Sequence, residues 1–186
     1  MTPPSPQKSA PASEFARIVK LDQAVSNAAG GHITAEPEEC AALARRFGFA
    51  RIDRLAADYT LAEENGVLMA RGQLRAALAQ PCVATGEPVE ETIDQPFVIR
   101  FAREGELPQD GALDEFELSE EDCDTHFYAG GTIDIGEAVA QTLALAVTPY
   151  PRAPDADQWL RARGVLTEDQ AGPFAALAAL KGKPGG

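Results

Sequence analysis

The sequence has little of what a secreted or membrane-spanning protein needs. It holds only three cysteines, Cys40, Cys82 and Cys123, an odd number of residues that stand far apart. Such cysteines are poor material for a disulfide framework and fit a reducing compartment. No run approaches the roughly 20 apolar residues that a membrane helix requires. The opening residues, MTPPSPQKSAPAS, have no apolar core of a secretory signal. We therefore expect a cytoplasmic protein.

Basic residues are also few. Sixteen Lys and Arg stand against 29 Asp and Glu, which gives a formal net charge of −13. Residues 104–151 hold twelve acids and no base, whereas residues 14–103 hold thirteen acids and ten bases. An acidic surface repels phosphate backbones and attracts basic partners. The acidic segment 104–137 is therefore either a solvated face or a site for a basic partner.

No metal-binding or cofactor-binding motif is present in the sequence. A structural zinc site needs about four nitrogen or sulfur ligands, which usually come in CxxC-type pairs. The three cysteines here have only His32 and His126 to join them, and a cluster would need a coincidence of folding. The glycine pairs lack the spacing of phosphate-binding loops. We expect no cofactor and no metal.

Catalytic groups are equally scarce. A cysteine nucleophile needs a histidine within hydrogen-bond reach and a lowered thiol pKa. Glu87, Glu90 and Glu91 lie near Cys82 in the sequence, and we expect them to raise its pKa. A free cysteine that closes a strand is more often a small buried apolar residue, so we interpret Cys82 as structural. Asp134 and Glu137 suit helix capping better than acid–base work. We expect no catalytic residue and no enzyme.

The chain divides into three parts by composition. Residues 1–13 are rich in Pro, Ser and Ala and predict a disordered lead. Residues 14–152 predict one domain, and residues 153–186 a C-terminal extension with a short helix near residues 168–181. Within the domain, the side chains of residues 14–21 alternate in the way that is typical of a β-strand, which predicts a first strand. The turn-rich stretch that follows leaves room for another strand around residues 32–34.

The sequence also predicts a sheet built on a hairpin. Two strand-like runs, residues 51–64 and 67–80, flank Asn65-Gly66, which favours a tight turn. A third antiparallel strand over residues 89–102 follows after a short connection, which favours a meander. We predict an α+β fold with two or three packed helices and a sheet able to curl into a partial barrel.

Two of those helices have clear signals. Residues 37–47 open with Pro and acids and carry apolar residues at helical spacing up to Gly48. Asp134 and Glu137 form an Asp version of the capping box before an apolar face that continues to Val147. We expect both helices to pack on the sheet.

Three segments form an ordered set: QPCVATGEPVEETI, THFYAGGTIDIGE and VAQTLALAVTPYPRAP. Taken together they resemble the YceD family, the large ribosomal RNA subunit accumulation proteins of bacteria and plastids, in the style of alphaproteobacterial members. The order and spacing match from about Phe15 to Arg152. The resemblance singles out residues that we interpret as structural: Gln80, Cys82, Thr85, Glu87, Pro88, Asp134, Gly136 and Glu137. Many relatives have a second cysteine where Thr85 stands and a cysteine-rich C-terminus, both of which this chain lacks.

The resemblance implies a cytoplasmic, non-enzymatic factor in large-subunit ribosomal RNA accumulation and ribosome assembly. Its partner would be that RNA or a pre-ribosomal particle. The charge distribution adds a hypothesis of its own, that the acidic segment 104–137 shields a basic ribosomal protein. RNA affinity comes from Lys and Arg. Our candidate RNA-binding residues are therefore the arginines around the first helix and on the hairpin: Arg45, Arg46, Arg51, Arg54, Arg71 and Arg75.

Two alternatives remain open. The same arginines can instead pair with neighbouring acids such as Asp53 and Asp58, in which case they are not available to RNA. The second alternative is an acidic protein–protein adaptor with no direct RNA contact.

Overall fold

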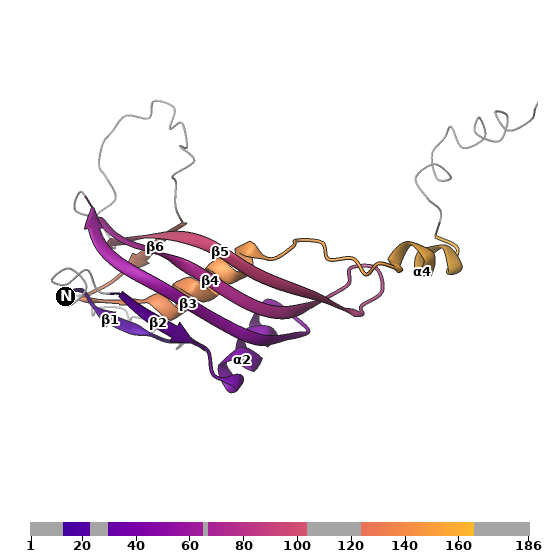
Figure 1. Ribbon diagram of the computed structural model, residues 1–186, viewed down its shortest axis with the longest axis horizontal. Helices are drawn as coiled ribbons and strands as arrows, with labels where there is room; N and C mark the ends of the chain where they lie inside the picture. The colour runs from indigo at the N-terminus through magenta and orange to yellow at the C-terminus, as the bar shows by residue number, and fades with distance from the viewer. Residues whose placement is uncertain (1–12, 23–29, 65–66, 104–123, 166–186) are drawn as a thin grey trace, which may run out of the picture. The chain divides into compact units, whose positions relative to one another are not determined.

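The structure is a computed structural model that describes residues 13–22, 30–64, 67–103 and 124–165 (Figure 1). The chain forms two compact units, one from residues 1–79 and 90–147 and the other from residues 80–89 and 148–186. None of the helices in the described ranges is long and apolar enough to cross a bilayer. Predictions for residues 1–12, for Asn65-Gly66 and for residues 166–186 lie outside the described residues.

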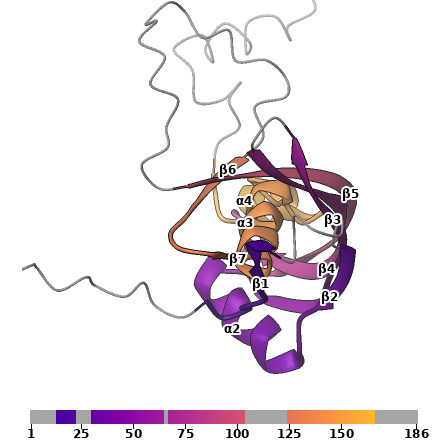
Figure 2. The ribbon, with the colours of Figure 1, turned by 90° about the vertical axis from the view of Figure 1, so that its left-hand side faces the viewer.

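The first unit contains a five-stranded sheet in the order β2-β3-β4-β5-β6. Its strands are β2 (Gly30–Thr34), β3 (Arg51–Glu64), β4 (Val67–Pro81), β5 (Pro88–Arg103) and β6 (Asp124–Tyr128). β1 (Ile18–Lys20) and β7 (Thr132–Asp134) form a separate two-stranded antiparallel sheet. Among the described residues the larger sheet curves around α3 (Ile135–Ala146) without closing (Figure 2). The predicted α+β fold is confirmed.

The predicted hairpin is confirmed as β3 and β4, which pair along nearly their whole length. Leu55 lies opposite Ala76 and Leu61 opposite Ala70, and all four side chains are buried. A β-bulge near Ile52 shifts the register once. Because side chains alternate along a strand, the arginines of β4 lie on the opposite face from this core.

The sheet departs from a simple meander at β6. This strand pairs with β5 in parallel, with Ile99 opposite Asp124 and Arg103 opposite Tyr128. Residues 104–123, all of them outside the described residues, connect β5 to β6, and a parallel pair needs such a long connection. The first strand is also shorter than the predicted residues 14–21, because only Ile18–Lys20 finds a partner strand, in β7.

Both predicted helices are confirmed. α2 spans Pro37–Phe47, packs against β3 and ends at Gly48, whose φ of 73° is left-handed. α3 begins after Asp134, whose Oδ1 accepts the backbone N–H of Glu137 at 3.2 Å. A third helix, α4 (Ala156–Ala162), belongs to the second unit and was not predicted.

The chain before β1 locks the start of α3. Phe15 is fully buried in the core, and the Arg17 backbone N–H donates to Asp134 Oδ1 at 2.8 Å. The Arg17 guanidinium donates two hydrogen bonds to the Glu39 carboxylate on α2, at 2.8 and 2.7 Å. This segment therefore ties α2 to α3 beneath the sheet.

Candidate nucleic-acid interface

The six predicted arginines lie on three elements of the first unit. Arg45 and Arg46 occupy the last turn of α2, Arg51 and Arg54 the start of β3, and Arg71 and Arg75 the outer face of β4. All six are exposed or half-buried. Whether these arginines can bind RNA phosphates depends on how many of them already form ion pairs with carboxylates of the same chain.

Arg46 is fully engaged. Its guanidinium donates to both carboxylate oxygens of Glu137, at 2.8 and 2.6 Å, and also to Glu14 at 2.9 Å. The hydrogen bonds to Glu137 and then to Glu14 raise the pKa of Arg46 above its ordinary value. Such a bidentate pair is among the stronger charge-assisted contacts. Arg46 therefore joins α2 to α3 and is not free for phosphate.

Three further arginines are paired on the sheet. Arg51 donates to Glu90 and Asp53, and Arg71 donates to Glu64 at 2.9 Å. Arg75 donates to Asp58 at 2.6 Å. Four of the six candidate arginines thus form ion pairs with carboxylates of the same chain. Two of these carboxylates, Asp53 and Asp58, were expected from sequence.

The pair between Arg75 and Asp58 belongs to a polar network on the outer sheet face. Asp58 Oδ1 lies 2.7 Å from His32 Nδ1, and His32 Nε2 lies 2.9 Å from Thr34 Oγ1. Arg75 and His32, in that order, lower the pKa of Asp58. Asp94 extends the network, since it accepts from Gln73 at 2.6 Å. Sequence analysis missed this network because it joins β2, β3, β4 and β5.

The series Thr34–His32–Asp58 has the order of a nucleophile, a base and an orienting acid. Its surroundings differ from those of a working triad. The side chains of His32 and Asp58 are 58% and 50% exposed, and the Asp58 carboxylate is shared with Arg75. Water reaches these groups, so they lack the water-excluded setting in which such electrostatics are strong.

The first half of the motif segment builds the second unit. Gln80, although buried, donates from Nε2 to the Thr148 carbonyl oxygen at 3.0 Å. The backbone N–H of Cys82 donates to the Glu87 carbonyl oxygen at 2.7 Å, and Thr85 Oγ1 accepts the Glu87 N–H at 3.2 Å. Pro88 opens β5 directly afterwards. These residues form a tight turn that docks on the chain after residue 148.

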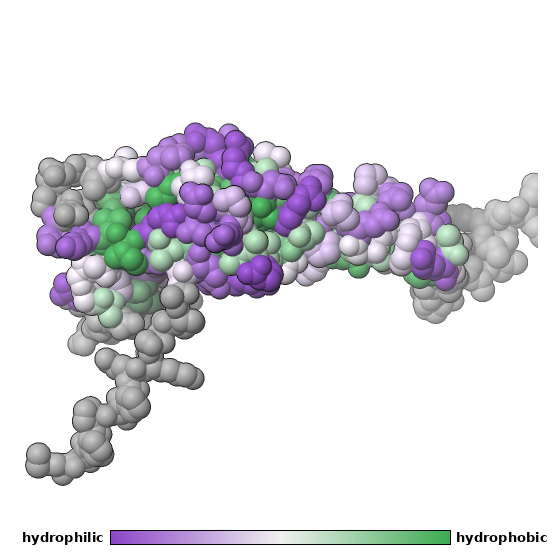
Figure 3. Space-filling model, turned by 90° about the horizontal axis from the view of Figure 1, so that it is seen from below, coloured by the Kyte–Doolittle hydropathy of each residue, from purple (hydrophilic) through white to green (hydrophobic). Residues whose placement is uncertain are grey.

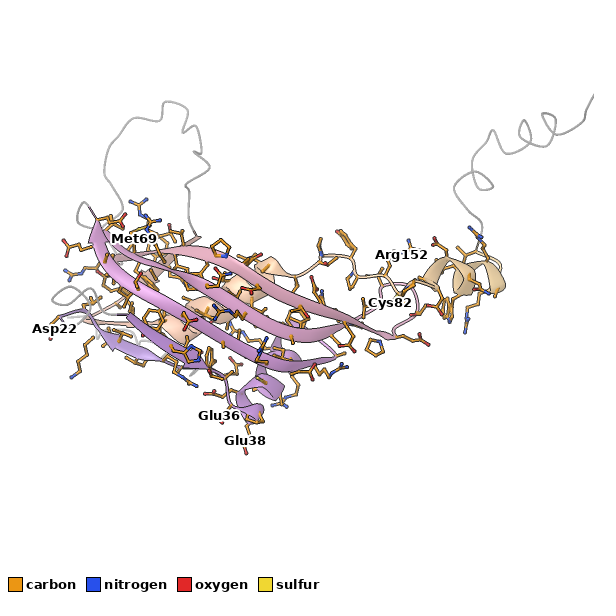
Figure 4. All side chains as sticks on the ribbon, in the orientation of Figure 1. Asp22, Glu36, Glu38, Met69, Cys82 and Arg152 are labelled. Atoms are coloured by element: carbon orange, nitrogen blue, oxygen red, sulfur yellow. The ribbon has the colours of Figure 1, made fainter. Side chains whose placement is uncertain are left out.

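Cys82 holds that docking in place. Its Sγ accepts the backbone N–H groups of Ala153, at 3.3 Å, and Thr85, at 3.4 Å, and only 3% of the residue is exposed. Figure 4 shows Cys82 beside Arg152, the neighbour of Ala153. These donors, Ala153 first, lower the pKa of the Cys82 thiol to about 7. Our expectation of a raised pKa was wrong, because hydrogen bonds from these donors stabilise the thiolate.

The second half of the motif segment builds the start of α3. Asp134 accepts hydrogen bonds from Arg17 and Glu137 backbone N–H groups. At Gly136 an added Cβ would lie 1.9 Å from the Phe15 carbonyl oxygen, so only glycine permits this approach. The Glu137 carboxylate does not complete a capping box as predicted; it turns to Arg46 instead. Arg46, followed by Gln141 and Ser13, lowers the Glu137 pKa to about 2.

One pocket in the described part of the first unit has a volume of about 230 Å³. Apolar and aromatic side chains line it, among them Phe101, Phe127 and Tyr128, with Asp134 and Glu137 at its edge. Both of those carboxylates already serve the start of α3. No three His, Cys, Asp or Glu side chains of the described residues are placed to hold a metal, and Cys123 lies outside them.

Five arginines form no ion pair with another described residue. They are Arg45, Arg54, Arg100, Arg161 and Arg163. The last two lie at the end of α4, where Arg163 stacks over Trp159, and sequence analysis did not single them out. Figure 3 shows hydrophilic side chains over much of the face that it draws, with apolar patches among them. The signal that could have found α4 is the sequence WLRAR, which places arginines two and four residues after a tryptophan.

The fold and site define an α+β protein whose motif side chains hold backbone segments together. The chain belongs to the YceD family, described as large ribosomal RNA subunit accumulation protein YceD, because the family model matches residues 70–181, more than half of its length. No curated protein and no solved structure matches the chain. The alphaproteobacterial type and the domain boundaries after residues 13 and 152 stay predictions.

Proposed function

We propose that this protein is a non-enzymatic factor that supports accumulation of large-subunit ribosomal RNA during ribosome assembly in the cytoplasm. The observation that carries the proposal is the family match over residues 70–181. That stretch contains both motif segments, and their polar side chains are occupied in backbone and ion-pair contacts. The motif residues therefore stabilise the fold, and we expect other, exposed residues to contact the partner.

Two features support the absence of an active site. The paired acids Asp134 and Glu137 are committed to the helix start and to Arg46. The series Thr34–His32–Asp58 is open to water on the sheet face. Replacing His32 by Ala should leave large-subunit RNA levels unchanged, and a loss equal to that of a deletion strain would argue for catalysis at this position.

A second candidate is the acidic adaptor without RNA contact. The observation that favours it is the pairing of Arg46, Arg51, Arg71 and Arg75 with carboxylates of the same chain. An adaptor would hold a basic ribosomal protein through the acidic segment 104–137, shielding it until it meets RNA. Charge complementarity of this kind raises association rates and is weakened by salt.

One experiment separates the two candidates. The tagged protein is recovered from native lysate at low salt, one half is treated with nuclease, and the bound RNA is sequenced. Enrichment of large-subunit over small-subunit ribosomal RNA, with release of the bound proteins by nuclease, supports direct RNA contact. Protein partners that survive nuclease, with no RNA enriched, support the adaptor.

The acidic segment has a test of its own. Six of the nine acids in residues 104–122 are replaced by Asn or Gln, which leaves Asp134 and Glu137 to hold the fold. We expect weaker retention of the basic partner at low salt. Ribosome association that is unchanged in this variant would remove the acidic segment from the account.

A further inference from the structure

The arginines left without a carboxylate are not evenly spread. Arg45, Arg54 and Arg100 stand on separate elements, whereas Arg161 and Arg163 lie two residues apart at the end of α4. Neither of the last two forms an ion pair with a described residue. Two arginines without a carboxylate partner on one short element are the densest source of unneutralised positive charge in the described structure.

The same element carries the single tryptophan of the chain. The Arg163 guanidinium lies 3.5 Å from the centroid of the Trp159 ring, and the Trp159 side chain is half-buried. Tyr150, in the same unit, is 76% exposed. Exposed aromatic rings beside arginines are the composition of surfaces that stack nucleic-acid bases and contact phosphates together.

The local charge also differs from that of the whole chain. Residues 148–165 hold three arginines and two aspartates, so this stretch is positive although the chain as a whole has a net charge of −13. Arg152 pairs with Asp157. The remaining charged residues of this stretch, Arg161, Arg163 and Asp155, give it a net positive charge. A phosphate backbone is attracted here and repelled by the acidic segment 104–137.

The motif turn holds this element in place. Val83 N–H donates to the Pro151 carbonyl oxygen at 2.9 Å, and Ala153 N–H donates to Cys82 Sγ. Ala156 at the start of α4 is 1% exposed, and Gly164, with a φ of 77°, ends the helix. The turn around Cys82 thus has a purpose beyond local stability, because it presents α4 and Tyr150 on a defined base.

We propose that Tyr150, Trp159, Arg161 and Arg163 form a binding surface for single-stranded RNA. The rings stack on unpaired bases, and the two guanidinium groups contact the neighbouring phosphates. This inference rests on the proposed function, since it names the surface by which the protein would meet large-subunit ribosomal RNA. It moves the RNA contact from the hairpin to the second unit.

Trp159 makes the test direct because it is the only tryptophan in the chain. A purified full-length sample is titrated with a single-stranded RNA oligonucleotide of mixed sequence, and tryptophan fluorescence is followed. Stacking of a base on Trp159 quenches the emission. A duplex of the same strand, whose bases are stacked internally, should quench much less.

Two variants give the comparison. Arg161→Gln with Arg163→Gln keeps the tryptophan and should weaken binding about tenfold, and flatten the salt dependence by about 0.7 in log–log slope for each arginine. Arg45→Gln with Arg54→Gln removes the same charge from the first unit and should change neither quantity. Circular dichroism confirms that both variants are folded.

Three results would overturn the proposal: no quenching by single-stranded RNA at low salt, equal affinity in the Arg161/Arg163 variant, or an equal loss in the Arg45/Arg54 variant. These results leave the proposed function intact if the native pull-down still enriches large-subunit RNA. Quenching without that enrichment would instead keep the surface and remove the proposed cellular role.

Discussion

At the scale of single residues, Glu137 shows how the motif serves the fold. Its carboxylate accepts from Arg46, Gln141 and Ser13, which belong to α2, α3 and the chain before β1. The sequence identified Glu137 as a residue that matters at the helix start. It could not identify Arg46 as the partner, because the two residues stand 91 positions apart.

Glu137→Gln should destabilise the protein by about 1–3 kcal/mol at neutral pH, since a charge-assisted pair is lost. The folded pKa of about 2 lies below the ordinary 4.5. The stabilisation is therefore complete above pH 4.5 and is lost as the pH falls through about 2. Urea unfolding of both proteins at pH 7 and pH 3 should show the difference shrinking. Glu38→Gln, at an exposed position of α2, is the control and should show no such trend.

Cys82 gives a second prediction at this scale. In a Cys123→Ser background, a thiolate absorbance titration should show a midpoint near pH 7, and Cys82→Ala should remove it. Burial and then Glu39 raise the pKa of Cys40, so that thiol should titrate above 9.0. Because the folded pKa of Cys82 is lowered, its thiolate stabilises the fold above pH 9 and loses that effect as the pH falls through 7. A Cys82 midpoint at or above 9.0 would contradict the geometry.

At the scale of elements, local sequence signals predict some helices and strands, whereas others depend on partners that are distant in the chain. α2, α3, β3, β4 and β5 follow from capping residues, turn residues and alternation, all of which are local in sequence. β1, β6 and β7 are three to five residues long, and partners distant in the chain fix them. The parallel pairing of β6 carries no local signature at all. α4 was missed because its seven residues are too few for a periodic pattern.

The approach of the N-terminal segment to α3 can be tested at Gly136. Glycine to alanine inside a helix normally stabilises by roughly 0.5–1 kcal/mol. Here the added Cβ would lie 1.9 Å from the Phe15 carbonyl oxygen, so Gly136→Ala should instead destabilise by about 1–3 kcal/mol. Thermal or urea unfolding measures the sign. Gly131→Ala, where an added Cβ meets nothing within 4 Å, is the control, and stabilisation by Gly136→Ala would refute the close approach.

At the scale of the whole molecule, charge separates the surface that we propose for RNA from surfaces whose arginines are paired with carboxylates. The chain carries a net charge of −13, and most of its hairpin arginines are neutralised by carboxylates of the same chain. Sequence analysis placed Arg71 and Arg75 on the hairpin, and the structure puts both on its outer face, away from the core. Sequence analysis left open whether they would pair with acids such as Asp58, as Arg75 does, and it did not single out Glu64, which accepts from Arg71.

Arg71→Gln with Arg75→Gln should therefore leave RNA retention in the native pull-down within about twofold of the parent protein. Stability should change little, because exposed ion pairs contribute little. Arg161→Gln with Arg163→Gln, measured alongside, should reduce retention much further. A larger loss from the hairpin variant would return the RNA contact to the sheet face.

The central claim is that this protein supports accumulation of large-subunit ribosomal RNA. The most direct measurement is the ratio of large-subunit to small-subunit ribosomal RNA in cells that lack the protein, compared with cells in which it is restored. The account predicts a ratio that falls on removal and recovers with the parent chain or with His32→Ala. A ratio that stays unchanged on removal would contradict it.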